Sequence, residues 1–60
     1  MNLEIGNIYV DKSSPEIRMH VIDVQRDLVI CNLEGGGFKY RIPTEKFEEY
    51  FREPLTEDGD

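Results

Sequence analysis

Apolar and polar residues alternate in four short stretches of this chain. The stretches are residues 7–10, 16–24, 28–33 and 38–42, and β-branched and aromatic residues recur in them. Alternation with a period of two places successive side chains on opposite faces of a strand. Residues that favour turns separate the stretches at 11–15, 25–27 and 34–37. The pattern therefore predicts four β-strands joined by short loops.

Two of these stretches depart from simple alternation. In residues 16–24, Ile17, Met19 and Val21 share one face, whereas Ile22 and Val24 add apolar residues to the other face. This change predicts a long strand with a bend or bulge, of the kind that serves two sheets of a small barrel. The stretch 28–33 begins with four apolar residues, which predicts a central strand.

The period changes to that of a helix after residue 43. Phe47, Tyr50 and Phe51 recur at i, i+3 and i+4, which is one face of a helix. Thr44 is the expected N-cap, and the charge of Glu45 is favourable in the first turn. We expect a helix over about residues 45–52, ended by the following proline. An alternative prediction is that residues 53–55 form a last strand, which covers the open edge of the sheet.

These elements predict a mainly β fold, a small barrel of four to five antiparallel strands with one short helix near the C-terminus. The predicted domain is residues 1–55, and residues 56–60 are expected to be a disordered acidic tail. The predicted core takes one face of the helix and of each strand, with both faces of the central stretch 28–33: Ile8, Val10, Met19, Val21, Val29, Ile30, Phe38, Tyr40, Ile42, Phe47 and Phe51.

This order of elements resembles small SH3-like barrels, in which a single helical turn precedes the last strand. The features that carry the resemblance are residues 6–11 (GNIYVD), the valine-rich second strand, the glycine-rich hairpin, and Ile42 and Pro43 followed by Phe47 and Phe51. Over about residues 5–52 the chain is similar to short, uncharacterised phage and prophage proteins of this barrel type.

The resemblance implies that Tyr9, Phe47 and Phe51 pack the inside of the barrel. The peptide-binding surface of eukaryotic SH3 domains uses an ALYDY-type aromatic run and a tryptophan, and the chain has neither. The resemblance therefore does not imply binding of proline-rich ligands.

Three consecutive glycines, at 35–37, lie between two predicted strands. Glycine loops that bind phosphate lead from a strand into a helix, and their glycines are spaced as in GxxxxGK[ST] or GxGxxG. Here a strand follows, and no Lys-Ser or Lys-Thr pair comes after the glycines. We therefore predict a hairpin turn that binds no nucleotide.

Length and composition narrow the classes of protein. The chain has 60 residues, a formal net charge of −6 and a single cysteine, Cys31, with a single histidine, His20. An intramolecular disulfide and a Cys/His zinc cluster are excluded, and a reducing cytoplasm fits best. The N-terminus has no basic region followed by an apolar run, and no apolar run approaches the roughly 20 residues of a membrane span.

The residues that carry reactive groups do not predict an enzyme. A catalytic triad would need His20 as general base, Asp23 to orient it and Cys31 as nucleophile. On a regular strand, however, residues 20 and 23 face opposite ways, and Cys31 lies in an apolar run. The acidic pairs near the C-terminus match no calcium loop. We expect no catalysis, no metal and no cofactor.

A basic strip is one candidate binding surface. Lys39 and Arg41 share a strand face, Arg18 is expected on a neighbouring face, and Tyr40 is nearby. Small barrels bind single-stranded nucleic acid through such cations and aromatic rings. Against this stands a sequence pI of about 4.6, because a nucleic-acid-binding domain is usually basic.

The other candidate surface is acidic. Residues 45–60 hold seven acidic and two basic residues, which is −5 of the total −6. Glu45, Glu48, Glu49 and Glu53 are the candidate contacts to a basic protein partner, although such runs are commonly only solvated.

Three functions follow from these surfaces. We expect a non-catalytic protein-interaction or regulatory module, with a single-stranded nucleic-acid-binding barrel, or an acidic mimic of nucleic acid that inhibits a host protein, as alternatives. The chain has more apolar side chains than one small barrel is expected to bury, and the excess is at Ile22, Val24, Val29 and Leu33. We therefore also predict a two-fold dimer through the strand at 16–24 or the strand at 38–42.

Overall fold

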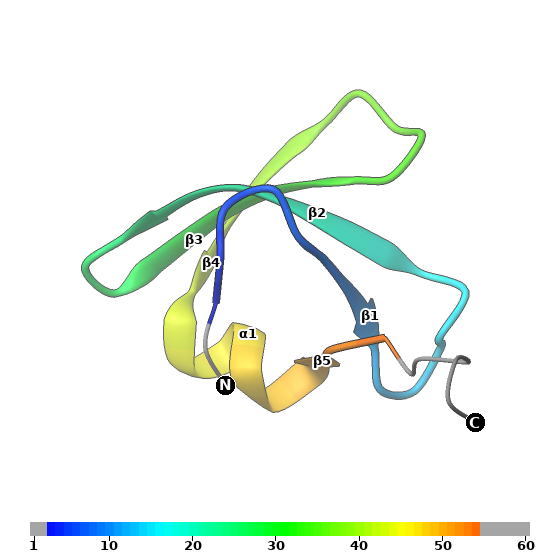
Figure 1. Cartoon of the computed structure of the whole chain (residues 1–60). Coiled ribbons are helices and arrows are strands. Elements are labelled where there is room, and N and C mark those ends of the chain that lie inside the picture. The colour runs from blue at the N-terminus through cyan, green and yellow to red at the C-terminus, as the bar shows by residue number, and fades with distance from the viewer. Residues whose placement is uncertain (1–2, 55–60) are drawn as a thin grey trace.

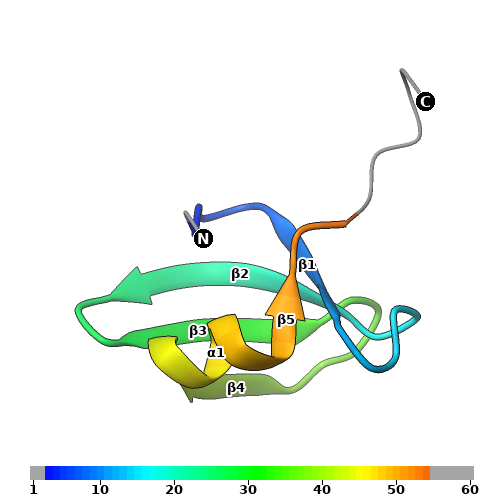
Figure 2. The same cartoon turned by 90° about the horizontal axis from the view of Figure 1, so that it is seen from below.

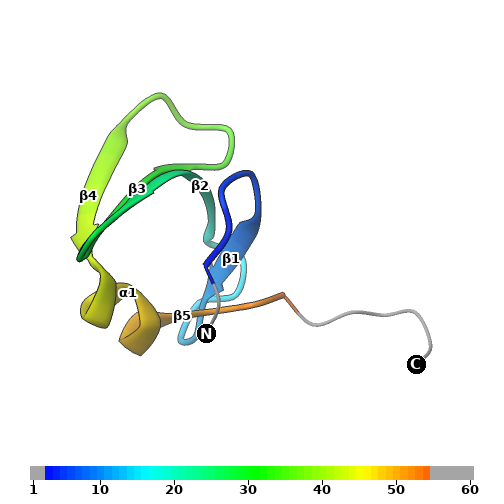
Figure 3. The ribbon, with the colours of Figure 1, turned by 60° about the vertical axis from the view of Figure 1, so that its left-hand side comes forward.

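The alternating stretches form one curved antiparallel sheet. The computed structural model, which describes residues 3–54, contains β1 (Ile8–Asp11), β2 (Arg18–Gln25), β3 (Leu28–Leu33), β4 (Lys39–Pro43), the helix α1 (Thr44–Tyr50) and β5 (Phe51–Arg52). The strand order is β4-β3-β2-β1-β5. The sheet curls so that α1 lies across its open side between β4 and β5 (Figures 1 and 3). The predicted fold class, a mainly β small barrel with one short helix, is confirmed.

The predicted irregularity in β2 is a bulge at Ile22. Val21 pairs with Cys31, but Asp23 pairs with Ile30, so Ile22 is the extra residue on β2. A bulge bends its strand and changes which residues face inward after it. Val24 consequently packs against the core, although it is three residues after the buried Val21.

Aromatic rings fill the inside of the barrel. Tyr9, Phe47 and Phe51 are buried, as the resemblance implied. The rings of Tyr9 and Phe47 meet edge to face with centroids 5.7 Å apart, and those of Phe47 and Phe51 stack at 4.7 Å. The hydroxyl oxygen of Tyr9 accepts a hydrogen bond of 3.1 Å from the backbone N–H of Glu4, so the buried ring keeps a polar partner.

Most of the predicted core is confirmed. Val10, Met19, Val21, Val29, Phe47 and Phe51 are buried, and Ile42 packs against the core. Tyr9 and Cys31 belong to the core although the alternation did not select them. Val24 and Leu33 pack against the core and Val29 is buried, so three of the four residues expected to exceed the barrel are accommodated inside it.

Four predicted core residues are wrong. Ile8 and Ile30 are only partly buried, because they lie on the outer face of the sheet with the cross-strand pair His20 and Asn32. Phe38 is 76% exposed and Tyr40 is 40% exposed. The hairpin that joins β3 and β4 projects beyond the body of the barrel (Figure 1), so the start of β4 has no layer packed over it.

The helix is shorter than predicted. It ends at Tyr50, and Phe51 and Arg52 form β5, which pairs with β1 at Asp11 and Val10. Residues 51–52 therefore close the sheet, where the prediction placed the end of the helix. Pro43 occupies the N-cap position, and no side chain caps the helix, so the prediction of Thr44 as N-cap is wrong. Figure 2 shows α1 packed over β3 and β4 with β5 after it. The predicted tail, residues 56–60, lies outside the described residues.

The glycine-rich connection contains a β-turn, as predicted. The N–H of Gly36 donates to the carbonyl oxygen of Leu33 at 2.8 Å, and Gly35 has a φ of +83°. Glu34, at the second position of this turn, does not have a positive φ, so the positive φ at the third position indicates type II, for which glycine is favoured there. A strand follows this turn, so the helix N-terminus that completes a phosphate loop does not come after these glycines.

Candidate functional site

The β4 strand and the loop before it form the most exposed apolar feature of the described sheet. β4 pairs with β3 along one side, and no described strand lies along its other side. Phe38 and Tyr40, with 76% and 40% of their surface exposed, are adjacent to this edge. We call β4 together with Phe38 the β4 edge. An unpaired strand next to exposed aromatic rings is a surface that another chain can extend.

The hydrogen-bond pattern shows which main-chain groups of β4 are free for such pairing. The N–H of Thr44 donates to the carbonyl oxygen of Asp27 at 3.0 Å, and residues 27 and 44 continue the register that pairs Leu28 with Pro43. Hydrogen-bonded and non-hydrogen-bonded pairs alternate along an antiparallel ladder. Tyr40 and Ile42 therefore direct their main-chain groups to β3, and Lys39 and Arg41 direct theirs away from it.

Pro43 fits this pattern. It also falls on a position whose main chain points away from β3, where the missing N–H removes no bond from the ladder. The outward side of β4 thus presents the N–H and C=O groups of Lys39 and Arg41, whereas the carbonyl of Pro43, the N-cap residue, belongs to the first turn of α1. This short series of groups ends where α1 begins.

The four residues predicted to contact nucleic acid lie in three places. Lys39 and Arg41 lie together on the outer face, where Lys39 pairs with Asn32 and Asn32 with His20. Tyr40 pairs with the buried Cys31, which places it on the opposite, inner face. Arg18 is held by Glu34, with Nε and Oε1 at 2.6 Å. The cations and the ring therefore do not form one stacking surface.

The acidic residues predicted to contact a protein lie on and after α1. Glu45, Glu49 and Glu53 are exposed, and Glu48 is partly buried with an interaction of its own. Glu49 lies 3.8 Å from Lys46, and both side chains are more than half exposed. Exposed pairs of this kind contribute little free energy. On the helix itself, the exposed carboxylates are therefore those of Glu45 and Glu49.

The reactive residues are not assembled. Cys31 is fully buried on the inner face, and burial raises the pKa of its thiol. His20 and Asp23 both lie on the outer face, because the bulge at Ile22 shifts the alternation by one residue. The expectation that they face opposite ways is therefore wrong. Asp23 accepts hydrogen bonds from the N–H of Val24 at 2.9 Å and from the Gln25 amide at 3.4 Å, and the sheet separates it from Cys31.

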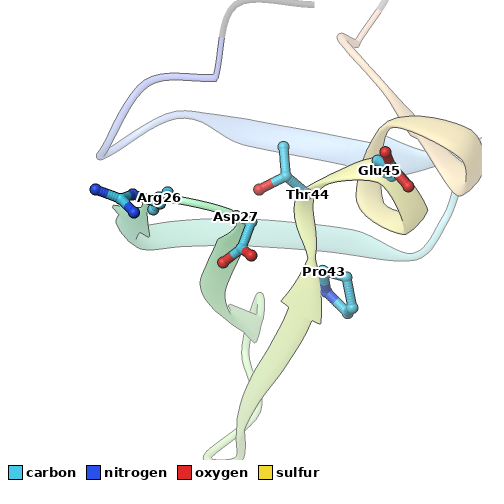
Figure 4. A pocket seen from close by; sticks show the side chains of 5 residues that line it. All are labelled: Arg26, Asp27, Pro43, Thr44 and Glu45. Carbon is cyan, nitrogen blue, oxygen red and sulfur yellow. The ribbon is translucent and has the colours of Figure 1, made fainter.

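A pocket of about 430 Å³ lies at the C-terminal end of β4 (Figure 4). Arg26 and Asp27 of the β2–β3 turn line one side, and Pro43, Thr44 and Glu45 line the other. The hydroxyl oxygen of Thr44 is buried without a hydrogen-bond partner among residues 3–54. The charged residues that line the pocket are one cation, Arg26, and two carboxylates, Asp27 and Glu45. Its lining contains no nucleophile paired with a base.

The part of the chain that the structure describes has neither a metal-binding cluster nor a membrane-spanning helix. Within it, no three His, Cys, Asp or Glu residues are grouped so as to hold a metal ion. No helix in residues 3–54 is long and apolar enough to cross a membrane.

Sequence reasoning missed Phe38 as a surface residue, because the alternation of residues 38–42 alone assigns it to the core. The signal that marks it is the run of three glycines immediately before it. Glycine has no side chain to pack, so three glycines in a row are typical of a part of a hairpin that lies outside the core. Phe38 directly follows them and lies in that exposed part.

Comparisons with protein-family models, with curated proteins and with solved structures find no match to this chain. The resemblance to phage and prophage proteins stays a prediction.

Proposed function

We propose that this chain is a non-catalytic protein-interaction module that binds a partner protein through the β4 edge. The observation that carries the proposal is the exposure of Phe38 and Tyr40 beside a strand with no second neighbour in the described sheet. Aromatic side chains are enriched at protein interfaces, and a free strand edge supplies main-chain hydrogen bonds to another chain.

The rest of the chemistry supports a binding role. The thiol of Cys31 is buried, its pKa is raised, and His20 lies on the other face of the sheet. A lone buried cysteine needs no oxidising compartment, and we place the protein in the cytoplasm as part of the proposal. The phage-type origin is proposed from the resemblance alone.

Two alternatives use other surfaces. A nucleic-acid-binding barrel would use Lys39 and Arg41, and binding to a single-stranded oligonucleotide at low salt would be lost on Lys39→Ala/Arg41→Ala. An acidic mimic of nucleic acid would use Glu45, Glu48, Glu49 and Glu53 on and after α1. Substitution of those glutamates by glutamine would then abolish binding, whereas changes at β4 would leave it intact.

Site-specific photo-cross-linking tests the proposal and separates the alternatives. Benzoylphenylalanine replaces either Phe38, at the β4 edge, or Tyr50, which is 53% exposed on α1 and serves as the matched aromatic control. In source cells, the probe at 38 is expected to capture a discrete protein that the probe at 50 does not. Capture at 50 alone would assign the interface to the acidic helix. Capture of nucleic acid at 38, or of nothing at either position, would overturn the proposal.

A further inference from the structure

We infer that the ligand of the β4 edge is an extended acidic segment of another protein, in which acidic and apolar residues alternate. This inference rests on the proposed function and adds the chemistry of the partner. The segment would lie along β4 as a sixth strand. Its main chain would bond the outward groups of Lys39 and Arg41, its acidic side chains would share their face, and its apolar side chains would lie beside Tyr40.

The charges of the edge carry the argument. Lys39 and Arg41 are exposed, and no ion pair between described residues involves either of them. Both present an outward N–H and C=O, so a strand that uses those groups must place residues opposite these two cations. Residues directly opposite across an antiparallel pair share a face, where unlike charges attract and like charges repel. Acidic side chains are therefore favoured at alternate positions of the ligand.

The inner face selects apolar residues at the positions between them. Tyr40 pairs with the buried Cys31 on the core side of the sheet, yet 40% of its surface is exposed. An added strand would place its intervening side chains next to this ring and extend the apolar surface of the core. The edge thus distinguishes the two faces of its ligand by charge on one side and by apolar contact on the other.

A second copy of this chain is a poorer ligand for the same edge. In a two-fold antiparallel pairing centred on Tyr40, Lys39 would lie opposite Arg41 of the other copy, and this contact would occur twice. Four cations would then lie together on one face, two on each strand. Charged residues, lysine above all, are a device by which edge strands avoid pairing with their own kind.

Single-stranded nucleic acid shares the negative charge but not the rest of the chemistry. It has no peptide groups to complete the ladder, and its bases stack on rings that lie near its phosphates. Here the rings and the cations lie on opposite faces, and Arg18 is already held by Glu34 at 2.6 Å. The net charge of −6 also opposes a long polyanion more than a short acidic strand.

Amide exchange measured by NMR tests the inference. The probes are a hexapeptide that alternates glutamate with valine, its lysine–valine counterpart, and a peptide with the same glutamates and valines in two blocks. We expect the alternating acidic peptide alone to give saturable shifts at residues 38–42. At ten times its Kd it should slow exchange at the amides of Lys39 and Arg41 about tenfold. The amides of Tyr40 and Ile42, which already bond β3, should change little.

Charge reversal supplies the control. Lys39→Glu/Arg41→Glu should invert the preference, so that the lysine–valine peptide binds. Lys12→Glu/Lys46→Glu makes the same change in net charge at exposed residues away from β4, and should leave the preference unchanged. The inference is overturned by equal binding of the block peptide, by shifts without protection of Lys39 and Arg41, or by stronger binding of an oligothymidylate.

The two proposals fail in different ways. If no acidic peptide binds but the probe at position 38 still captures a protein, the acidic ligand is wrong and the interaction module stands. If the probe captures nothing and no peptide binds, both are wrong.

Discussion

Gly35 has the one backbone conformation in the β3–β4 loop that a side chain would strain. Its φ is +83°, whereas Gly37 lies outside the left-handed region and a Cβ added there meets nothing within 4 Å. We expect Gly35→Ala to lower the free energy of unfolding by about 1–2 kcal/mol. Gly37→Ala should raise it by about 0.4–1 kcal/mol, because it restricts the unfolded chain. Urea denaturation of the pair checks this, and equal effects would contradict the assigned turn.

The thiol of Cys31 should make stability depend on pH in the alkaline range. Burial raises its pKa in the folded state, so the folded protein retains a proton that the unfolded chain has lost. The stabilisation is complete below the ordinary pKa of a cysteine and is lost as pH rises through the folded value. We expect the free energy of unfolding to fall in that range, and to fall less steeply in Cys31→Ala. Parallel curves for the two proteins would refute this role.

At the level of elements, α1 contributes one fully buried side chain to the core. Phe47 is fully buried between the rings of Tyr9 and Phe51. Phe47→Ala should cost about 3–5 kcal/mol. A domain of this size has a total stability of roughly 3–9 kcal/mol. We therefore expect circular dichroism to show a largely unfolded population, whereas Tyr50→Ala, on the exposed side of the same helix, should unfold like the wild type. A stable Phe47→Ala variant would show that the strands fold without α1.

The sequence was informative where one local pattern decides the outcome. Alternation located β1 to β4, and the switch near Ile22 predicted the irregularity in β2. It failed where a position depends on distant contacts. Phe51 fits a helix face, but pairing with β1 takes it into β5. Phe38 fits a core face, but nothing in its own stretch shows that the hairpin projects beyond the core (Figure 1).

The same limit applies to the candidate site. Lys39 and Arg41 were identified as neighbours because a strand repeats every two residues. That they carry the outward main-chain groups of an edge depends on the bond from Thr44 to Asp27, which joins residues far apart in the sequence. The sequence therefore indicated the charged residues, but the edge they belong to required the sheet order.

Over the whole molecule, charge is unevenly distributed. β4 holds two cations and no acidic residue, while residues 44–54 hold four glutamates against Lys46 and Arg52. The net charge of −6 repels other acidic molecules at a distance, and salt screens this repulsion beyond about 10 Å at 0.1 M. An acidic ligand is therefore attracted only once it is near the edge, which favours recognition by contact over long-range steering.

Self-association stays a prediction, but its interface is now restricted. The strand at 16–24 is wrong as an interface because β2 pairs with both β1 and β3, which leaves β4. Pairing through β4 sets Lys39 against Arg41 of the other copy, so a partner with reversed charges should pair better than an identical one.

We expect an equimolar mixture of wild type and Lys39→Glu/Arg41→Glu to dimerise at lower concentration than wild type alone. Each lysine or arginine of one chain would then lie opposite a glutamate of the other, and the main-chain bonds would be the same in both dimers. Sedimentation equilibrium from micromolar to hundred-micromolar loading measures this. Wild type mixed with Lys12→Glu/Lys46→Glu, which matches the change in net charge away from β4, should gain nothing. Monomer mass throughout the charge-reversed mixture would exclude β4 as a surface for self-pairing, and equal association of wild type alone would show that its cations do not govern the edge.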